Sequence, residues 1–198
     1  MGLILDYTDG QTPLEEEEKE GLLIPGINTR RELDEFEQQN IEQAILWTMG
    51  KRFKMESILT EAFIRNIHKR MYGDVWAWAG EFRKTNKNLG VDKWQISTQL
   101  KILLDDAEYW YQNKTFSPDE FAMRFSHKLV SIHCFTNGNG RHSRLMADII
   151  IDKIFYQPVY SWGAGKIVKE SDQRSRYLKA MREADKGNME MLIEFARS

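Results

Sequence analysis

The most constraining feature of this sequence is a polar stretch at residues 133–144, because one helical pattern leads into it and another follows it. Ser117 and Pro118 predict the start of the first helix, with a hydroxyl that can cap the third amide and a proline at the first helical position. Glu120 would complete a capping box by reaching back to the cap residue. Beyond the stretch, apolar residues recur at spacings of three and four from Leu145 to Phe155. The stretch is therefore expected to be a loop that joins two core helices and lies at the N-terminus of the second.

Helical periodicity elsewhere predicts an all-α fold. Between residues 74 and 94 the pattern changes to short runs around Asn and Gly, which predict a small β-hairpin, the one strand signal in the chain. Trp76, Trp78 and Trp110 are interpreted as core residues rather than as a stacking platform for a ligand, because aromatic residues at helical spacing usually pack in a core. The expected helices cover residues 31–50, 57–71, 96–111, 117–132, 139–155 and 171–186, with a short last helix through Met191, Leu192 and Phe195.

Length and charge exclude several classes of protein. The 198 residues suffice for one domain, and the net charge of -2 from 28 basic and 30 acidic residues gives no overall attraction to nucleic acid or to an anionic membrane. No apolar run is long enough to span a bilayer, and the N-terminus lacks a basic region ahead of a long apolar run. The single cysteine, Cys134, can form neither an internal disulfide nor a CxxC metal site, which fits a reducing compartment. We therefore expect a cytoplasmic protein that binds no nucleic acid directly and no membrane.

The residues of the 133–144 stretch have the chemistry of a phosphate site. Gly138 and Gly140 permit backbone conformations and close approaches that side chains would block, and they adjoin the unpaired amides and positive dipole end of a helix. Arg141 and Arg144, three residues apart on its first turn, can bind further phosphate oxygens with planar guanidinium groups. His133 ends the preceding helix, where a neutral imidazole can accept the proton of a hydroxyl that attacks phosphorus. The stretch thus predicts a polyphosphate cradle with a base beside it.

The whole stretch resembles the signature of the Fic (filamentation induced by cAMP) family, His-Pro-Phe-x-Asp/Glu-Gly-Asn-Gly-Arg-x-x-Arg. Its sequence here is His133-Cys134-Phe135-Thr136-Asn137-Gly138-Asn139-Gly140-Arg141-His142-Ser143-Arg144. The resemblance extends to residues 78–83, which are similar to the start of the family's target-docking flap, and to residues 177–180 and 184–187. Residues 5–7 and 11–14 resemble the small bacterial Fic proteins called mobile mystery protein B.

The resemblance implies a Fic-type helical bundle with a small β-hairpin flap, as a single domain over residues 1–198. In it, residues 1–30 form an N-terminal arm and residues 31–198 form the helical core. The implied reaction moves AMP, or another nucleoside monophosphate, from ATP or another triphosphate to a Ser, Thr or Tyr hydroxyl of a target protein, with Mg²⁺ as cofactor. Relatives of this type resemble mobile-element products paired with a helix-turn-helix or antitoxin partner, so such a partner is also implied, whereas the oligomeric state is not.

The resemblance also implies roles for individual residues. His133 is the general base, Arg141 and Arg144 bind the outer phosphates, and the metal-ligand position falls on Asn137. Phosphate is bound by Gly138, Asn139 and Gly140, and the flap that would align a target segment by strand addition comprises Lys87, Asn88, Leu89, Gly90 and Val91.

Two positions depart from the family pattern. Cys134 replaces a proline, which removes no catalytic group, and a buried packing role is favoured over that of a nucleophile. Asn137 replaces the acidic residue that holds Mg²⁺. A carboxamide oxygen can ligate a hard cation, but without a charge it should do so more weakly. The alternative function is therefore a catalytically weakened, nucleotide-binding component of a toxin–antitoxin pair.

A second rival function is a metal-dependent hydrolase that uses His127, His133 and His142. This interpretation lacks nearby paired carboxylate ligands, and the two arginines of the stretch would oppose a cation.

The N-terminal arm carries the acidic run Glu15–Glu18, for which Thr12 and Pro13 predict a helix start and whose charge is typical of a solvated segment. Many Fic proteins are restrained by a helix bearing Ser/Thr-x-x-x-Glu-Gly/Asn, whose glutamate pairs with the second arginine of the signature. No complete match occurs in this sequence. Restraint is therefore expected either from a separate partner or from this arm, through Arg144.

Overall fold

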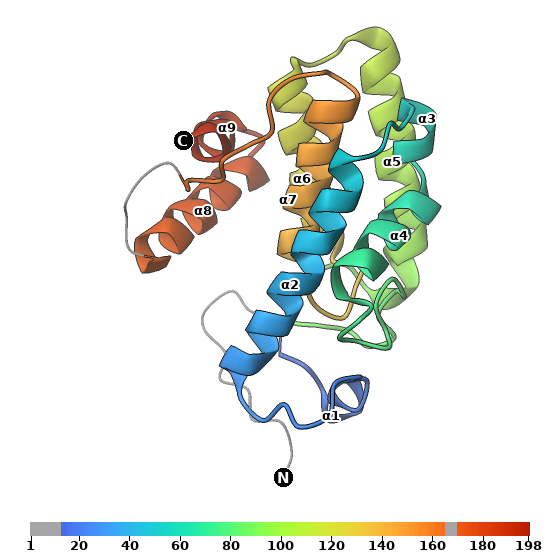
Figure 1. The fold of residues 1–198 in the computed structure, drawn as a ribbon. Helices are drawn as coiled ribbons and strands as arrows, with labels where there is room; N and C mark the ends of the chain where they lie inside the picture. The colour runs from blue at the N-terminus through green and yellow to red at the C-terminus, as the bar shows by residue number, and fades with distance from the viewer. Residues whose placement is uncertain (1–12, 165–169) are drawn as a thin grey trace.

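The computed structural model describes residues 13–164 and 170–198, and in these ranges the chain is almost entirely helical, as predicted (Figure 1). The expected cap Thr12 and the resemblances at residues 5–7, 11 and 12 lie outside the described residues. The helices are α1 (Glu16–Lys19), α2 (Arg30–Met49), α3 (Met55–Ile58), α4 (Glu61–Tyr72), α5 (Ile96–Asn113), α6 (Pro118–Ile132), α7 (Asn139–Lys153), α8 (Glu170–Asp185) and α9 (Glu190–Arg197), with a 3₁₀ helix, η1 (Lys93–Gln95), before α5.

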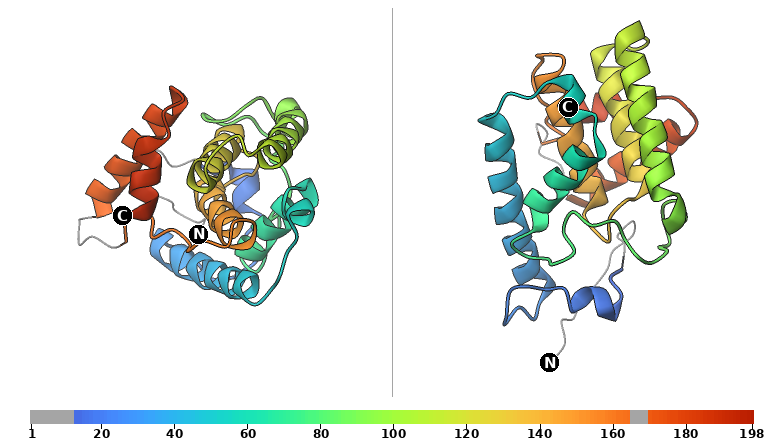
Figure 2. Two further views of the ribbon diagram at one scale, coloured as in Figure 1. Left: turned by 90° about the horizontal axis from the view of Figure 1, so that it is seen from above. Right: turned by 90° about the vertical axis from the view of Figure 1, so that its right-hand side faces the viewer.

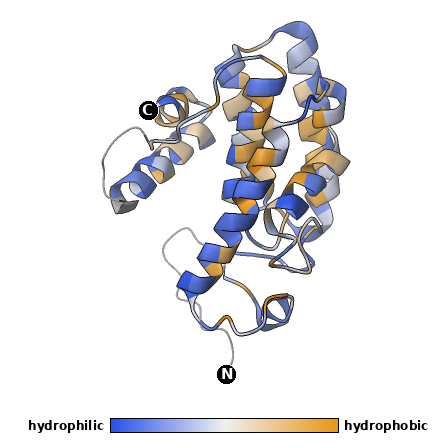
Figure 3. Ribbon diagram, in the orientation of Figure 1, coloured by the Kyte–Doolittle hydropathy of each residue, from blue (hydrophilic) through white to orange (hydrophobic). Residues whose placement is uncertain are grey.

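Helices α6 and α7 form the centre of the bundle, and the 133–144 stretch joins them as predicted. Phe121 and Phe125 of α6 and Met146 and Ile150 of α7 are fully buried, and Figure 3 shows apolar (orange) and polar (blue) residues alternating along the central helices. Each such side chain contributes about 1.5–3 kcal/mol on burial. The two ends of the stretch are therefore anchored by the core packing of the helices on either side.

The remaining helices cover this pair on different sides. Helices α4 and α5 pack against α7 and α6, α2 lies against α4, and α8 pairs with α9 beside α6 (Figures 1 and 2). One apolar core runs from Leu14 to Ala196 and includes Trp76, with Trp78 and Trp110 packed against it, so these three tryptophans are core residues as predicted.

Two local predictions were wrong. The range 57–71 is divided into α3 and α4, because the Thr60 hydroxyl accepts a hydrogen bond from Phe63 N and starts a new helix. At the start of α6, Ser117 Oγ caps Glu120 N as expected, but the Glu120 carboxylate pairs forward with Arg124 Nε (2.9 Å). Only half of the predicted capping box is therefore formed.

The predicted β-hairpin is also not formed: residues 82–92 are described throughout and contain no strand that pairs with another strand of the segment. Their backbone bonds instead to the chain before the loop, with Arg83 N donating to Cys134 O (3.0 Å) and Val91 N to Ile132 O (3.3 Å). Asn86 closes the segment by side-chain bonds to Asp92 and to Lys93 N. These partners satisfy the polar groups that a hairpin ladder would have used.

The N-terminal arm is docked on the bundle, although Glu15, Glu16 and Glu17 of its acidic run are exposed, as expected of a solvated segment. Helix α1 begins after Glu15, not after Thr12, and Glu15 N donates to Glu18 Oε2 (2.8 Å). The following backbone pairs with the chain near Trp76, through Ala77 N to Gly21 O and Leu23 N to Val75 O (both 2.8 Å). None of the helices among the described residues has the length and apolar character needed to cross a membrane.

Candidate functional site: the loop between α6 and α7

The backbone of the loop turns at two residues with positive φ. His133 ends α6 in the left-handed region (φ 58°), and Gly138 precedes α7 in the same region (φ 76°). A Cβ on Gly138 would lie 2.5 Å from the ring of Tyr72, so both the conformation and the space require glycine. The unpaired amides of the first turn of α7 then point into the loop region, as an anion cradle requires.

Two side chains hold the loop in this shape. Asn139 accepts from Phe135 N (2.9 Å) and donates to Phe135 O (2.8 Å), so its amide group is used within the loop. His68 Nε2 bonds to Asn137 O (3.0 Å) while its Nδ1 accepts from Gly80 N (3.0 Å), which fixes the tautomer with the proton on Nε2. If Asn139 binds phosphate, as the resemblance implies, it does so with its backbone.

His133 is almost fully buried, and its surroundings favour the neutral imidazole. Burial, together with the positive charges of Arg83 and Lys87, lowers the pKa of His133 to about 4. At neutral pH its ring is therefore unprotonated and able to accept a proton. The backbone of His133 is held as well, because its carbonyl accepts from Arg83 Nε (2.6 Å).

Arg141 is paired with a buried carboxylate of another helix. Its Nη2 lies 2.6 Å from Glu37 Oε2 of α2, without the alignment of a hydrogen bond, so the contact is an ion pair. The other oxygen of Glu37 accepts from Trp76 Nε1 (2.7 Å), and the guanidinium lies over the ring of Tyr72. Arg141 is thus held on one face and keeps further donors for a ligand.

Arg144 is held differently. Its guanidinium lies between two aromatic rings, 5.9 Å from the ring centre of Trp162 and 5.7 Å from that of Tyr177. Asp148, one turn further along α7, accepts from Trp162 Nε1 (3.1 Å) and so fixes that ring. The expected pairing of the N-terminal arm with Arg144 is not present in the described part of the chain.

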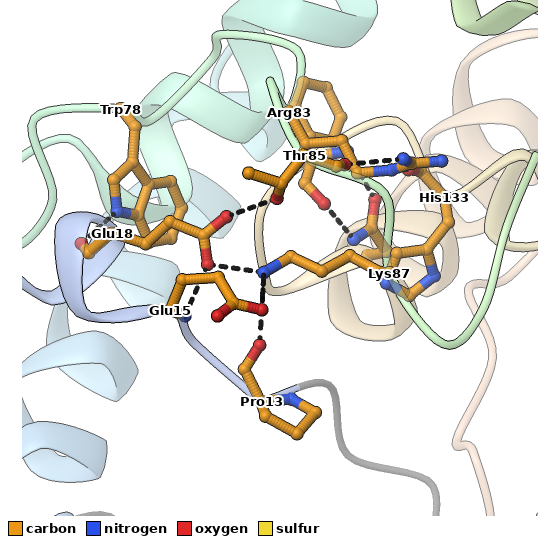
Figure 4. Close-up of polar contacts among 10 residues, drawn as sticks. Pro13, Glu15, Glu18, Trp78, Arg83, Thr85, Lys87 and His133 are labelled. Carbon is orange, nitrogen blue, oxygen red and sulfur yellow. Dashed lines mark hydrogen bonds and ion pairs between the residues drawn. The ribbon is translucent and has the colours of Figure 1, made fainter. Parts of the chain in front are cut away.

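The flap residues are divided between two environments. The side chain of Lys87 is buried and its ammonium group bonds to Glu18 of α1 (Figure 4), whereas Leu89 and Gly90 line the cavity of the site. Gly90 (φ 97°) packs so closely that a Cβ would lie 2.5 Å from Cβ of His133. Val91 is tied to the loop by its amide, and no described contact involves the side chain of Asn88.

One cavity of about 990 Å³ brings the predicted residues together. Its lining includes His133, Arg141 and Arg144 from the loop and α7, Leu89 and Gly90 from the flap, and Tyr177 and Met181 from α8. Asn137, Gly138, Asn139 and Gly140 also line it. The site therefore combines a neutral imidazole, two guanidinium groups and a helix N-terminus around a space large enough for a nucleotide.

The surroundings of Cys134 and of the histidines bear on two alternative interpretations, a cysteine nucleophile and a metal-dependent hydrolase. Cys134 is fully buried, and burial raises the pKa of its thiol to about 12, so it is a packing residue and not a nucleophile. Two of the three histidines of the hydrolase interpretation have separate partners: His127 bonds to Asp185, and His142 bonds to Ile64 O in the core. Within residues 13–164 and 170–198, no group of three His, Cys, Asp or Glu side chains is placed to hold a metal ion.

Sequence reasoning missed Glu37 and His68, although each leaves a signal. Both are polar residues on the apolar stripe of a helix, Glu37 four residues from Leu33 and Ile41, and His68 beside Ile67. Glu18 leaves no such signal, because its partner Lys87 is 69 residues away.

Comparison with known proteins places these features in a family. The sequence model described as Fic/DOC family matches residues 58–151. The protein adenylyltransferase Fic of Aedes aegypti is 27% identical over 159 residues, which are 78% of this chain and 30% of that protein. The protein of the same name from Drosophila grimshawi is 30% identical over 146 residues, 72% of this chain and 28% of that protein. The chain thus spans less than a third of the length of these relatives.

Solved structures share the arrangement of helices. A fragment of Fic-1 from C. elegans superposes with a TM-score of 0.64 at 23% identity, covering 90% of this chain and 50% of that chain. The BepC protein of Bartonella tribocorum, with bound AMPPNP, superposes with a TM-score of 0.67 at 19% identity, covering 92% of this chain and 97% of that chain. At these identities the likeness concerns the fold, and it confirms the predicted Fic-type helical bundle.

Proposed function

We propose that this chain, which belongs to the Fic/DOC family through its domain at residues 58–151, moves AMP or another nucleoside monophosphate from a triphosphate such as ATP to a hydroxyl of a target protein. The observation that carries the proposal is the neutral His133 facing one cavity with Arg141, Arg144 and the N-terminus of α7. We further propose that residues 1–198 act as one domain, with residues 1–30 as a regulatory arm. The continuous core from Leu14 to Ala196 supports this.

In the proposed reaction, His133 takes the proton of the attacking Ser, Thr or Tyr hydroxyl as its oxygen bonds to the α-phosphorus and pyrophosphate leaves. The backbone amides of residues 138–140, with Arg141 and Arg144, would stabilise the negative charge on the phosphates. Leu89, Gly90 and Val91 would align the target segment. Most of the rate gain would come from this positioning and from donors that are already in place.

Mg²⁺ is proposed as the cofactor, with Asn137 as a protein ligand beside oxygens of the nucleotide. Asn137 Oδ1 already accepts from Gly138 N (2.6 Å), and its second lone pair is the one suited to a cation. When bound, the ion would offset phosphate charge. The Asn137 side chain brings no charge of its own, so metal affinity should be below that of a carboxylate.

The test is incubation of the protein and a host lysate with ATP labelled at the α-phosphate. Wild type and the control variant His127→Ala, which changes a different histidine, should label a protein, whereas His133→Ala should not. His133→Ala should still bind ATP in isothermal titration, because the cradle remains. Binding of ATP by wild type without any labelling would favour the alternative function, a nucleotide-binding component of a toxin–antitoxin pair.

A helix-turn-helix or antitoxin partner is proposed on the resemblance to small bacterial mobile-element proteins. A cytoplasmic location is proposed because the single cysteine, Cys134, fits a reducing compartment. Co-purification from the native host, followed by identification of the bound chain, would test the partner.

A further inference from the structure

We propose that Glu18 of α1 is a positioning residue of the transferase site: it holds residues 85–87, at the start of the flap, in a fixed position relative to His133. The proposal deepens the function proposed above and rests on it. It places the N-terminal arm on the target-docking side of the site, where the flap lies, rather than at Arg144.

The contact between Glu18 and the flap uses both carboxylate oxygens (Figure 4). Oε1 accepts from the Thr85 hydroxyl (2.9 Å), and Oε2 accepts from the Lys87 ammonium group. The side chains of Lys87 and Glu18 are only 2% and 12% exposed. The ammonium group also donates to Pro13 O (3.3 Å), so its hydrogen-bond partners among the described residues belong to the arm. Because the pair is so little exposed, removing one of its two charges would leave the other buried without a partner, which lowers stability.

The arm is fixed by contacts that do not need the Glu18 side chain. Trp78 Nε1 donates to the backbone oxygen of Glu18 (3.0 Å), and Ala77 N donates to Gly21 O (2.8 Å). A Cβ on Gly21 would lie 2.7 Å from Trp78, so the arm and the segment around Trp78 are in close contact there. Glu18 therefore reaches the flap from a segment held by backbone contacts. Its carboxylate also accepts from Glu15 N (2.8 Å), a bond that a glutamine oxygen can keep, so Glu18→Gln should leave the arm docked.

The flap in turn contacts the backbone and Cβ of His133. Arg83 donates to Thr85 O (2.9 Å), to Val91 O and to His133 O (2.6 Å), so one guanidinium joins both limbs of the flap to the catalytic residue. Gly90 lies against Cβ of His133. A displacement at Thr85 and Lys87 would consequently be transmitted to the edge along which a target segment would bind.

The first test measures the flap without any substrate. Hydrogen exchange of the amides of residues 84–91 is compared in wild type, Glu18→Gln, Glu18→Asp and Glu16→Gln. Glu16 is the matched control, because it is an exposed acid of the same helix that pairs only with Lys19. Exchange should be about tenfold faster in Glu18→Gln, partly restored in Glu18→Asp and unchanged in Glu16→Gln. Equal exchange in wild type and Glu18→Gln would overturn the proposal.

The second test measures transfer to the protein labelled in the lysate experiment, purified as substrate. Glu18→Gln should raise KM for that protein about tenfold and leave the Kd for ATP unchanged, because the phosphate cradle lies elsewhere. An unchanged KM, or faster labelling by the variant, would overturn the positioning role. If wild type labels no protein at all, the transferase proposal fails, and the exchange result alone decides whether Glu18 holds the flap.

Discussion

Replacement of Gly138 by alanine is the sharpest test of the site geometry, and Gly140→Ala is its matched control. Both glycines lie in the same turn, but only Gly138 has a positive φ (76°). A Cβ at Gly138 would lie 2.5 Å from two carbons of Tyr72 and 2.6 Å from its hydroxyl. A Cβ at Gly140 would meet no atom within 4 Å. The two variants therefore add the same methyl group, at Gly138 against the Tyr72 ring and at Gly140 into open space.

The expected costs follow from these environments. At Gly138, the left-handed conformation costs an alanine about 1–2 kcal/mol, and forcing a methyl group against the Tyr72 ring costs about 1–3 kcal/mol more. The free energy of unfolding should therefore fall by about 2–5 kcal/mol, a large share of the roughly 5–15 kcal/mol typical of a domain. At Gly140, inside the first turn of α7, alanine should raise it by up to about 1 kcal/mol.

Urea unfolding measures the stability of each variant, and isothermal titration measures the affinity of each variant for ATP. The open space at Gly140 is where the anion cradle would receive a phosphate, so Gly140→Ala should weaken ATP binding while the protein stays as stable as wild type. Equal stability of Gly138→Ala and wild type would refute the contact with Tyr72. ATP binding by Gly140→Ala at wild-type strength would refute the phosphate position.

Three further changes test other parts of the site. Burial lowers the pKa of His142 to about 4 from 6.5, so the unfolded chain binds the extra proton between these values and stability is lost as pH falls from 6.5 to 4. Urea unfolding across that range should show a loss of up to about 3 kcal/mol from this residue, absent in His142→Gln. Glu37→Ala should lower stability by about 1–3 kcal/mol in the same assay, since it leaves Arg141 and the buried Trp76 indole without their partner. Asn137→Asp should increase magnesium-dependent AMP transfer, measured with labelled ATP, and no gain would contradict the role given to its missing charge.

The helices and the position of the loop could be predicted because their causes are local. Apolar spacing marks the buried faces of α6 and α7, and Ser117 and Pro118 mark the start of α6 whatever the rest of the chain does. The resemblance at residues 133–144 likewise identified cradle residues that lie together at one site, although their roles stay predictions.

The flap could not be predicted because its causes are distant in sequence. Asn and Gly between short runs are typical of a hairpin, but here Arg83 and Val91 find backbone partners at Cys134 and Ile132, about 50 and 40 residues away. The arm illustrates the same limit. Glu15, Glu16 and Glu17 are exposed as expected, but Glu18 is withdrawn from solvent by Lys87, a buried cation with no acidic neighbour in sequence.

The two signature arginines, equivalent in the sequence, differ in their supports, and the difference has a consequence for binding. Arg141 is tied to a fixed carboxylate, Glu37, which orients it but also competes for its charge. Arg144 lies 5.9 Å and 5.7 Å from the ring centres of Trp162 and Tyr177, and its charge acts on Asp148, one turn further along α7. A ligand phosphate would therefore compete with an ion pair at Arg141 and with the charge of Asp148 at Arg144.

Asn137 combines a retained role with a lost one. Its Oδ1 accepts from Gly138 N and so helps to hold the turn that gives Gly138 its positive φ. A carboxylate at this position could accept the same hydrogen bond and would add a negative charge beside the phosphates. The asparagine keeps the first contribution and omits the second, so the cradle is assembled without the charge that a divalent cation prefers. This separation is the physical reason to expect weakened metal binding in an otherwise intact site, and it is why Asn137→Asp should change metal dependence more than it changes the fold.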